Sequence, residues 1–224
     1  MIDCIFISPL GWSKHVWDKI ITDERFNDKS YEIIEFLNNS FEDIAEAYID
    51  KTIGDYLKNL SDEGVVITSS YGTVALISFL KRNNIKLNHL VVIDGLDIIP
   101  SLEELEHTFS CIEDRHYQNL LEYYDDMLSD EEKDDLELLR ILNYNLILKN
   151  GVYSPTLDTQ STLSYLSMYS NLDIEKELCL VLNKIKKLFI FSSRSISIPH
   201  TKIKEENHLL MLKAPQKVLE KIFY

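Results

Sequence analysis

The sequence predicts an α/β fold with a mostly parallel central sheet flanked by helices and a helical lid insertion. Two patterns support this prediction. Short apolar runs rich in Val, Ile and Phe alternate with segments of helical periodicity, as expected for strands buried on both faces of a parallel sheet. Residues 100–186 contain no convincing core strand. A stretch of that length between two core strands is typical of a lid.

The expected core strands are five strong apolar runs and one weaker run near the C-terminus. In chain order they are Ile5–Ile7, Tyr31–Leu37, Val65–Thr68, Leu90–Ile93, Leu188–Phe191 and the weaker His208–Leu212. Right-handed crossovers between such strands place helices on the faces of the sheet.

Helices are expected between these strands. Residues 41–60 carry apolar side chains at spacings of three and four, with Asn39 or Ser40 as the N-cap. Pro215 suits the first position of the last helix. The expected helical segments are Trp17–Ile21, Phe41–Leu60, Gly72–Leu80, Glu113–Leu148, Leu163–Leu182 and Pro215–Tyr224.

The composition limits the possible partners. The chain has 224 residues and a formal net charge of -14, so one domain is expected and a nucleic-acid partner is disfavoured. We expect a core of residues 1–99 and 187–224 and a lid of about 100–186.

No apolar run is long enough for a membrane span, and the N-terminus lacks the features of a signal peptide. Cys4, Cys111 and Cys179 are expected to be small buried or half-buried thiols in a reducing compartment. The expected location is the cytoplasm.

The strongest chemical signal is a buried strand that leads through Thr68-Ser69-Ser70-Tyr71-Gly72 directly into a helix. This motif resembles the nucleophile elbow of α/β-hydrolases, which usually reads G-x-S-x-G. The resemblance implies that Ser70 is a nucleophile on a sharp turn. Gly72 fits the pattern, whereas Thr68 stands where glycine is usual. The alternative is a serine that only caps the helix.

A histidine near the C-terminus is the candidate base. His208 enters a short apolar stretch that is followed by Pro215 and the last helix. This segment resembles the catalytic-histidine segment of the same superfamily. The resemblance implies that His208 is the base and ranks His200, which follows a proline in a loop, well below it.

The segment from Phe6 to Trp17 resembles the loop that often reads H-G-x-G-x-x-x-x-x-W in this superfamily. Gly11 and Trp17 fit, and Ser8-Pro9 stand where His-Gly is usual. The resemblance implies an oxyanion hole made by the backbone N–H groups of Leu10 and Tyr71. Because backbone groups have this role, the side-chain differences do not remove it.

The triad acid is the open question. Many members carry it after the penultimate strand, but residues 188–199 contain no carboxylate, and Ser195 stands about where an Asp is expected. Asp94 ends an earlier strand, and the thioesterase domains of nonribosomal peptide and polyketide synthases resemble this chain in placing their acid there. The resemblance implies Asp94, with Asp97 in reserve. Alternatively, Asp94 only caps a turn.

The resemblance implies a serine hydrolase or acyltransferase that forms an acyl-serine and needs no metal or organic cofactor. One hypothesis is a thioesterase whose acyl or peptidyl substrate is carried by a carrier protein. The lysines of the C-terminal third could dock an acidic carrier, although ordinary surface charge explains them equally well. The alternatives are a small carboxylesterase, or a related lyase or acyltransferase, of a biosynthetic pathway, and a non-catalytic binding protein that kept the fold.

Overall fold

A parallel sheet forms the centre of the molecule. The computed structural model describes residues 1–40, 42–112, 114–203 and 209–223. Among them, six strands pair in the order β2-β1-β3-β4-β7-β8, and every pairing is parallel. The predicted α/β fold with a mostly parallel sheet is therefore confirmed. The strands are β1 (Ile2–Leu10), β2 (Tyr31–Phe36), β3 (Leu60–Ser69), β4 (Leu87–Ile93), β7 (Ile185–Ser192) and β8 (Thr201–Lys202).

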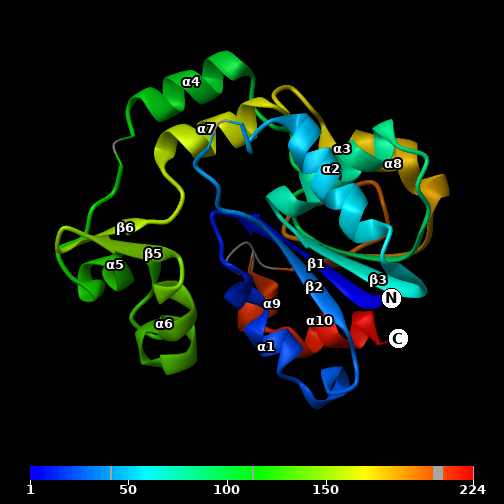
Figure 1. Ribbon diagram of the computed structural model, residues 1–224, viewed down its shortest axis with the longest axis horizontal. Coiled ribbons are helices and arrows are strands. Elements are labelled where there is room, and N and C mark those ends of the chain that lie inside the picture. The colour runs from blue at the N-terminus through cyan, green and yellow to red at the C-terminus, as the bar shows by residue number, and fades with distance from the viewer. Residues whose placement is uncertain (41, 113, 204–208, 224) are drawn as a thin grey trace.

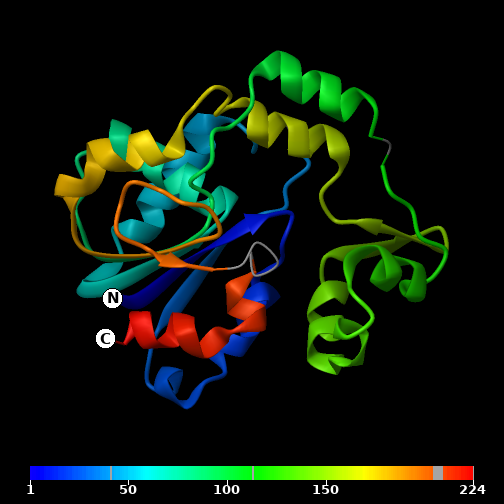
Figure 2. The same cartoon turned by 180° about the vertical axis from the view of Figure 1, so that it is seen from behind.

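Helices cover both faces of the sheet (Figures 1 and 2). Successive residues of a strand point to opposite faces, so β1 places Ile5 and Ile7 in one core and Cys4 and Phe6 in the other. The first core includes α2 (Glu46–Leu57), α3 (Tyr71–Arg82) and α8 (Ile174–Val181). The second includes η1 (Lys14–Trp17), α1 (Asp18–Ile21), η2 (Glu24–Phe26), α9 (Leu210–Lys213) and α10 (Pro215–Ile222).

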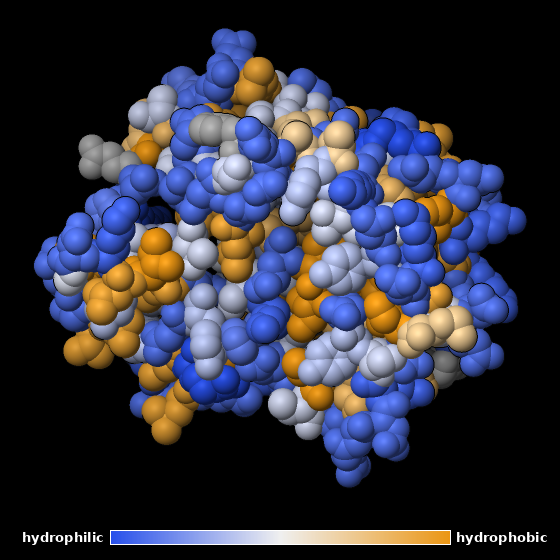
Figure 3. All heavy atoms as spheres, in the orientation of Figure 1, coloured by the Kyte–Doolittle hydropathy of each residue, from blue (hydrophilic) through white to orange (hydrophobic). Residues whose placement is uncertain are grey.

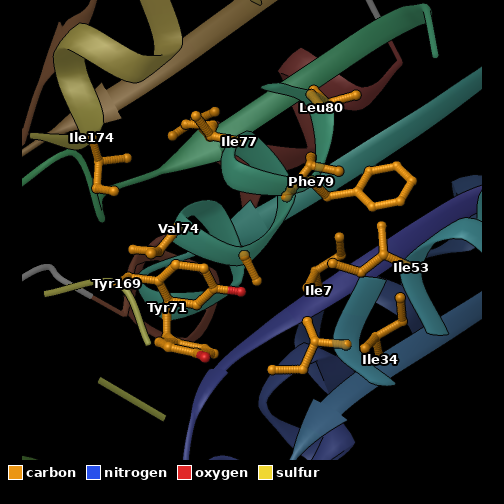
Figure 4. Close-up of a cluster of buried hydrophobic side chains, with 14 of the residues drawn as sticks. Ile7, Ile34, Ile53, Tyr71, Val74, Ile77, Phe79, Leu80, Tyr169 and Ile174 are labelled. Carbon is orange, nitrogen blue, oxygen red and sulfur yellow. The ribbon is translucent and has the colours of Figure 1, made fainter. Parts of the chain in front are cut away.

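Helix α3 is held firmly in the first core. Every residue from Tyr71 to Leu80 is buried. Figure 4 shows side chains of α3 beside Ile7 of β1, Ile34 of β2, Ile53 of α2 and Ile174 of α8. Close packing of this kind leaves a helix little freedom to shift. The turn that precedes α3 is thus fixed by the helix on one side and by β3 on the other.

The segment between β4 and β7 lies largely beside the core (Figure 1). We call its part from α4 to α7 the cap. Apolar surface gathers over its hairpin at the left of Figure 3, where Ile147 and Leu148 are exposed. The last helix of the segment, α8, packs against α3 in the first core. The cap comprises α4 (Leu102–Ser110), α5 (Leu120–Met127), η3 (Glu132–Asp134), α6 (Leu136–Asn143), β5 (Leu146–Lys149), β6 (Val152–Pro155) and α7 (Thr159–Ser167).

The hairpin of β5 and β6 was not predicted. The two strands pair in antiparallel register and form a sheet of their own. Their connection is Asn150-Gly151, and both residues have positive φ, 54° and 80°. Asn-Gly between strands favours the tight turn that needs two positive φ angles. The dipeptide is therefore a local hairpin signal within a stretch that was expected to be helix and loop.

Three predicted helical segments differ from the structure. The segment expected over Glu113–Leu148 is divided into α5, η3 and α6, and its last residues belong to β5. Helix α2 begins at Glu46 rather than near residue 41, because Ala45 is extended and acts as the N-cap residue. The N–H groups of Asp43 and Ile44 instead bond to the carbonyl of Ser40 in a separate turn. The helix expected over Leu163–Leu182 is divided into α7, α8 and the short η4 (Leu182–Lys184).

The weak strand predicted at His208–Leu212 is wrong for its described part. Leu210–Lys213 is helical, and Thr201–Lys202 forms the edge strand instead. A short apolar run can be a strand or a buried helical turn, and periodicity alone does not separate the two. Phe41, Glu113, His208 and Tyr224, which belonged to predicted elements, lie outside the described residues.

The three cysteines differ in exposure. Cys4 is buried as expected, whereas Cys111 and Cys179 are exposed, which corrects the prediction of buried or half-buried thiols. Burial raises the pKa of the Cys4 thiol to about 12. The thiolate is the reactive form, so Cys4 is protected both by its position and by its protonation.

Alkylation of the folded protein with iodoacetamide should therefore modify Cys111 and Cys179 and spare Cys4. Peptide mass spectrometry before and after denaturation in urea measures this directly. Cys4 should react only in the denatured sample. Modification of Cys4 in the native protein at the rate of the other two thiols would contradict the buried position of β1.

No helix in the described part of the chain is both long and apolar enough to cross a bilayer.

Candidate active site

Ser70 lies at the turn between β3 and α3 in a strained backbone conformation. Its φ is 51° and its ψ is -120°, a region that residues with a side chain rarely adopt. The Ser70 N–H donates to the carbonyl of Ile93 on the neighbouring strand β4 at 3.0 Å. The side chain is half-buried. The turn thus has the sharp geometry that the sequence motif predicted.

Two glycines allow this turn to pack. A Cβ on Gly72 would lie 2.4 Å from the carbonyl oxygen of Ile7 and 2.9 Å from that of Ser8. A Cβ on Gly95 would lie 2.2 Å from the carbonyl oxygen of Ser70. Both positions therefore require the absence of a side chain. The end of β1, the turn at Ser70 and the turn after β4 meet at these two glycines.

Thr68, which stands where the motif usually has glycine, is accommodated by hydrogen bonds. It is fully buried, and its hydroxyl lies 2.9 Å from the hydroxyl of Thr73 in the first turn of α3. Thr73 in turn donates to the carbonyl of Asp94 at 3.0 Å. A buried hydroxyl without a partner would be costly. The hydroxyl groups of the two threonines are hydrogen-bonded to each other, and together they connect the ends of β3 and β4.

Asp94 lies beside this turn. It directly follows β4, is 2% exposed and has a positive φ of 57°. Its N–H donates to the carbonyl of Phe191 at 2.8 Å, and its Oδ1 accepts the N–H of Ser193 at 3.2 Å. Because β4 neighbours β3, the candidate acid and Ser70 follow adjacent strands at the same edge of the sheet.

Asp97 and Ser195 have surface positions. Asp97 is exposed, and its Oδ1 lies 3.3 Å from Nε of Arg194 in an ion pair. Ser195, where an acid was most expected, is also exposed. The structure therefore separates the two candidate acids clearly by burial: Asp94 is enclosed between strand ends and Asp97 faces solvent.

The end of β1 approaches the turn at Ser70. Ser8 is fully buried, and its Oγ accepts the indole N–H of Trp17 at 3.0 Å. This bond explains how a serine replaces the usual histidine of the motif without leaving an unpaired polar group. Leu10 is the last residue of β1, and Gly11 follows with a φ of 75°. The crowding of Gly72 against Ile7 and Ser8 shows that the end of β1 lies next to the turn at Ser70.

Tyr71 connects the elbow to the cap. Its ring is buried, with its centroid 5.6 Å from that of Tyr165 on α7. Its hydroxyl donates to the carbonyl of Tyr165 at 3.2 Å. Burial raises the pKa of Tyr71 well above its ordinary value, so the hydroxyl remains protonated and a donor. The first N–H groups of a helix lack intrahelical partners, and the N–H of Tyr71 occupies that position in α3.

Of the two candidate bases, one is described. His200 is half-buried, and its Nδ1 lies 2.9 Å from the carbonyl oxygen of Ile198. His208 lies outside the described residues. The next residue, Leu209, precedes α9, which packs in the second core.

The structure thus brings together Ser70, Asp94 and the end of β1, which includes Leu10, at one edge of the sheet. Sequence reasoning missed Thr73 and Ser193, which hold Asp94 through its carbonyl and its carboxylate. Thr73 lies three residues after the candidate nucleophile, and in the sequence nothing distinguishes it from other threonines near the start of a helix. Only the pairing of β3 with β4 shows that its hydroxyl can reach the carbonyl of Asp94.

The comparisons with known proteins support the fold. No protein-family model and no curated protein matches the sequence, but solved structures do. They include E-2-(acetamidomethylene)succinate hydrolase, with a TM-score of 0.66, 10% identity and coverage of 99% of this chain and 91% of the other. The thioesterase domain from the curacin biosynthetic pathway has a TM-score of 0.60, 10% identity and coverage of 99% and 90%.

An α/β hydrolase from Novosphingobium aromaticivorans is also similar, with a TM-score of 0.61, 12% identity and coverage of 98% and 90%. Identities this low establish the architecture rather than the activity. The chain has the fold that these three proteins share, as the resemblance of its motifs implied.

Proposed function

We propose, on the premise of this α/β-hydrolase fold, that the protein cleaves an acyl ester or thioester through an acyl-Ser70 intermediate. The backbone at Ser70 is the observation that carries the proposal. An N-cap serine normally has an extended backbone and accepts an N–H of the first turn. Ser70 has a φ of 51°, and among the described residues its side chain accepts no capping hydrogen bond from the N–H groups of α3. Strain at a functional turn accounts for this conformation better than capping does.

In the proposed mechanism, His208 removes the proton from Ser70 Oγ as that oxygen attacks the acyl carbon. The N–H groups of Leu10 and Tyr71 donate to the oxyanion. Asp94 orients the imidazole and stabilises its protonated form. The imidazolium then protonates the leaving group, and water releases the acyl group from Ser70 by the same steps. Residues 100–186 serve as the lid of a single domain.

We further propose that the scissile bond is a thioester. Its support is the position of Asp94 after β4 and the similarity of the fold to a biosynthetic thioesterase domain. An acidic carrier protein would dock on exposed lysines of the C-terminal third, such as Lys186, Lys202 and Lys217. Lys184 is not one of them, because its Nζ donates to the carbonyls of Leu80 and Asn83. Lys213 forms an ion pair with Glu132.

Labelling with a small fluorophosphonate tests the nucleophile. We expect the protein to be modified at Ser70 and Ser70→Ala to remain unmodified, both read by peptide mass spectrometry. Ser69→Ala is the neighbouring control and should still be labelled, because Ser69 is the buried last residue of β3. A folded protein that does not react at Ser70 would contradict the proposal and favour the non-catalytic binding protein.

A pair of matched substrates tests the bond. The N-acetylcysteamine thioester and the p-nitrophenyl ester of the same acyl group differ in the leaving group alone. We expect turnover of both and a higher kcat/KM, relative to the uncatalysed rate, for the thioester. A preference for the oxygen ester would favour the carboxylesterase.

A further inference from the structure

A cavity of about 170 Å³ lies between the cap and the second core. From the cap, α5 and α6 contribute to its lining, and from the core, the loop after β1 and α9 do. In Figure 1, α6 lies on the side of the cap that is nearer to α9 of the core. The lining residues are Trp12, Met127, Leu128, Glu132, Leu138, Leu142, Leu209, Leu212 and Lys213.

The cavity adjoins two segments of the proposed active site. Trp12 is two residues after Leu10, and its N–H donates to the carbonyl of Pro9 at 3.3 Å, which keeps it in the turn after β1. Leu209 directly follows His208 in the chain. The cavity therefore has one wall from the loop of the proposed oxyanion hole and another from the segment of the proposed base.

The lining is apolar and electrically balanced. Seven of the nine lining side chains belong to Trp, Met or Leu. The two charged ones, Glu132 and Lys213, form an ion pair at 2.5 Å. The hydrogen bond from Lys213 lowers the pKa of Glu132 to about 2. Each charge is thus already matched, and a charged ligand would lose hydration without gaining a free counter-charge.

The volume limits the group that fits. An apolar cavity of about 150 Å³ in another protein holds a benzene molecule. We infer that this cavity is the acyl subsite of the proposed hydrolase and takes an uncharged, apolar acyl chain of about six carbons or a phenyl-sized group. The inference rests on the proposed function, since it needs an acyl group attached to Ser70.

A series of p-nitrophenyl esters tests the size limit. Each buried methylene contributes about a fourfold gain in kcat/KM. We expect kcat/KM to rise in this way from the acetyl to about the hexanoyl ester and to fall at the decanoyl ester. The phenylacetyl ester should match the hexanoyl ester, and the hemisuccinyl ester should be at least tenfold poorer than the uncharged butyryl ester of the same chain length.

Two variants should move the optimum in opposite directions. Leu142→Ala enlarges the cavity and should shift the optimum to a longer chain. Met127→Trp fills it and should shift the optimum to a shorter chain, and because Met127 is 40% exposed this change leaves the core intact. Leu139→Ala is the matched control on α6, since Leu139 is half-buried but does not line the cavity. It should keep the original optimum.

Labelling by a small fluorophosphonate separates the two ideas, because that reagent does not need the cavity. If the reagent does not label Ser70 in the protein without substitutions, the proposed function is overturned. Normal labelling of Ser70, together with a chain-length profile that Met127→Trp does not alter, would overturn the acyl subsite alone. Preference for the charged hemisuccinyl ester would overturn it as well.

Discussion

Asp94→Asn should lower kcat by about four orders of magnitude and leave the protein folded. An amide in place of the proposed triad carboxylate would keep the shape of the site but hold the imidazole in the wrong tautomer, and a loss of about 10⁴-fold follows. The amide oxygen can still accept the N–H of Ser193, which Oδ1 of Asp94 accepts at 3.2 Å. Steady-state hydrolysis of a p-nitrophenyl ester measures kcat, and circular dichroism checks the fold.

Asp97→Asn is the matched control, because it makes the same change three residues along the chain. Asp97 is exposed and its ion pair with Arg194 lies at the surface, where such pairs contribute about 1 kcal/mol or less. We expect kcat to stay within about threefold of the unmodified protein. A large loss in Asp97→Asn and a small one in Asp94→Asn would assign the acid to Asp97 instead.

Gly95→Ala should destabilise the fold by about 3 kcal/mol or more and abolish labelling of Ser70. The new Cβ would lie 2.2 Å from the carbonyl oxygen of Ser70, at a position with a φ of 84°. A left-handed conformation costs a residue with a side chain about 1–2 kcal/mol. The contact with the Ser70 backbone adds to that cost, because relief requires the strained turn to move. Urea denaturation measures the change in the free energy of unfolding.

Gly151→Ala separates the two contributions. Gly151 has a φ of 80°, close to that of Gly95, but a Cβ there would meet nothing within 4 Å. It should therefore cost only the conformational 1–2 kcal/mol and leave labelling of Ser70 unchanged. Equal losses of stability in the two variants would show that the close approach of Gly95 to Ser70 does not exist.

The parts of the fold that depend on local pattern could be predicted from the sequence. Continuous apolar runs indicated the core strands, and the Ser70-Tyr71-Gly72 motif indicated a sharp turn that the φ of Ser70 supports. The run at His208–Leu212 was ambiguous, because four or five apolar residues bury equally well as a strand or as a helical turn. In the tertiary structure, Leu210–Lys213 forms a helix.

The surroundings of the candidate site depend on contacts between distant segments. Sequence spacing could not separate Asp94 from Asp97, since both follow β4. Their burial separates them, and it results from the pairing of β4 with β3 and β7. The same pairing brings Thr73 to the carbonyl of Asp94. Strand order is a property of the whole sheet, and no local motif encodes it.

The contact between Tyr71 and Tyr165 limits how this scaffold can be re-engineered. The amide proposed to bind the oxyanion belongs to a residue whose phenol is anchored to α7 of the cap. Grafting a foreign cap to obtain a new acyl preference would remove that anchor along with the old pocket. A successful graft would have to retain α7, so that substrate choice could change while the proposed oxyanion donor stays in place.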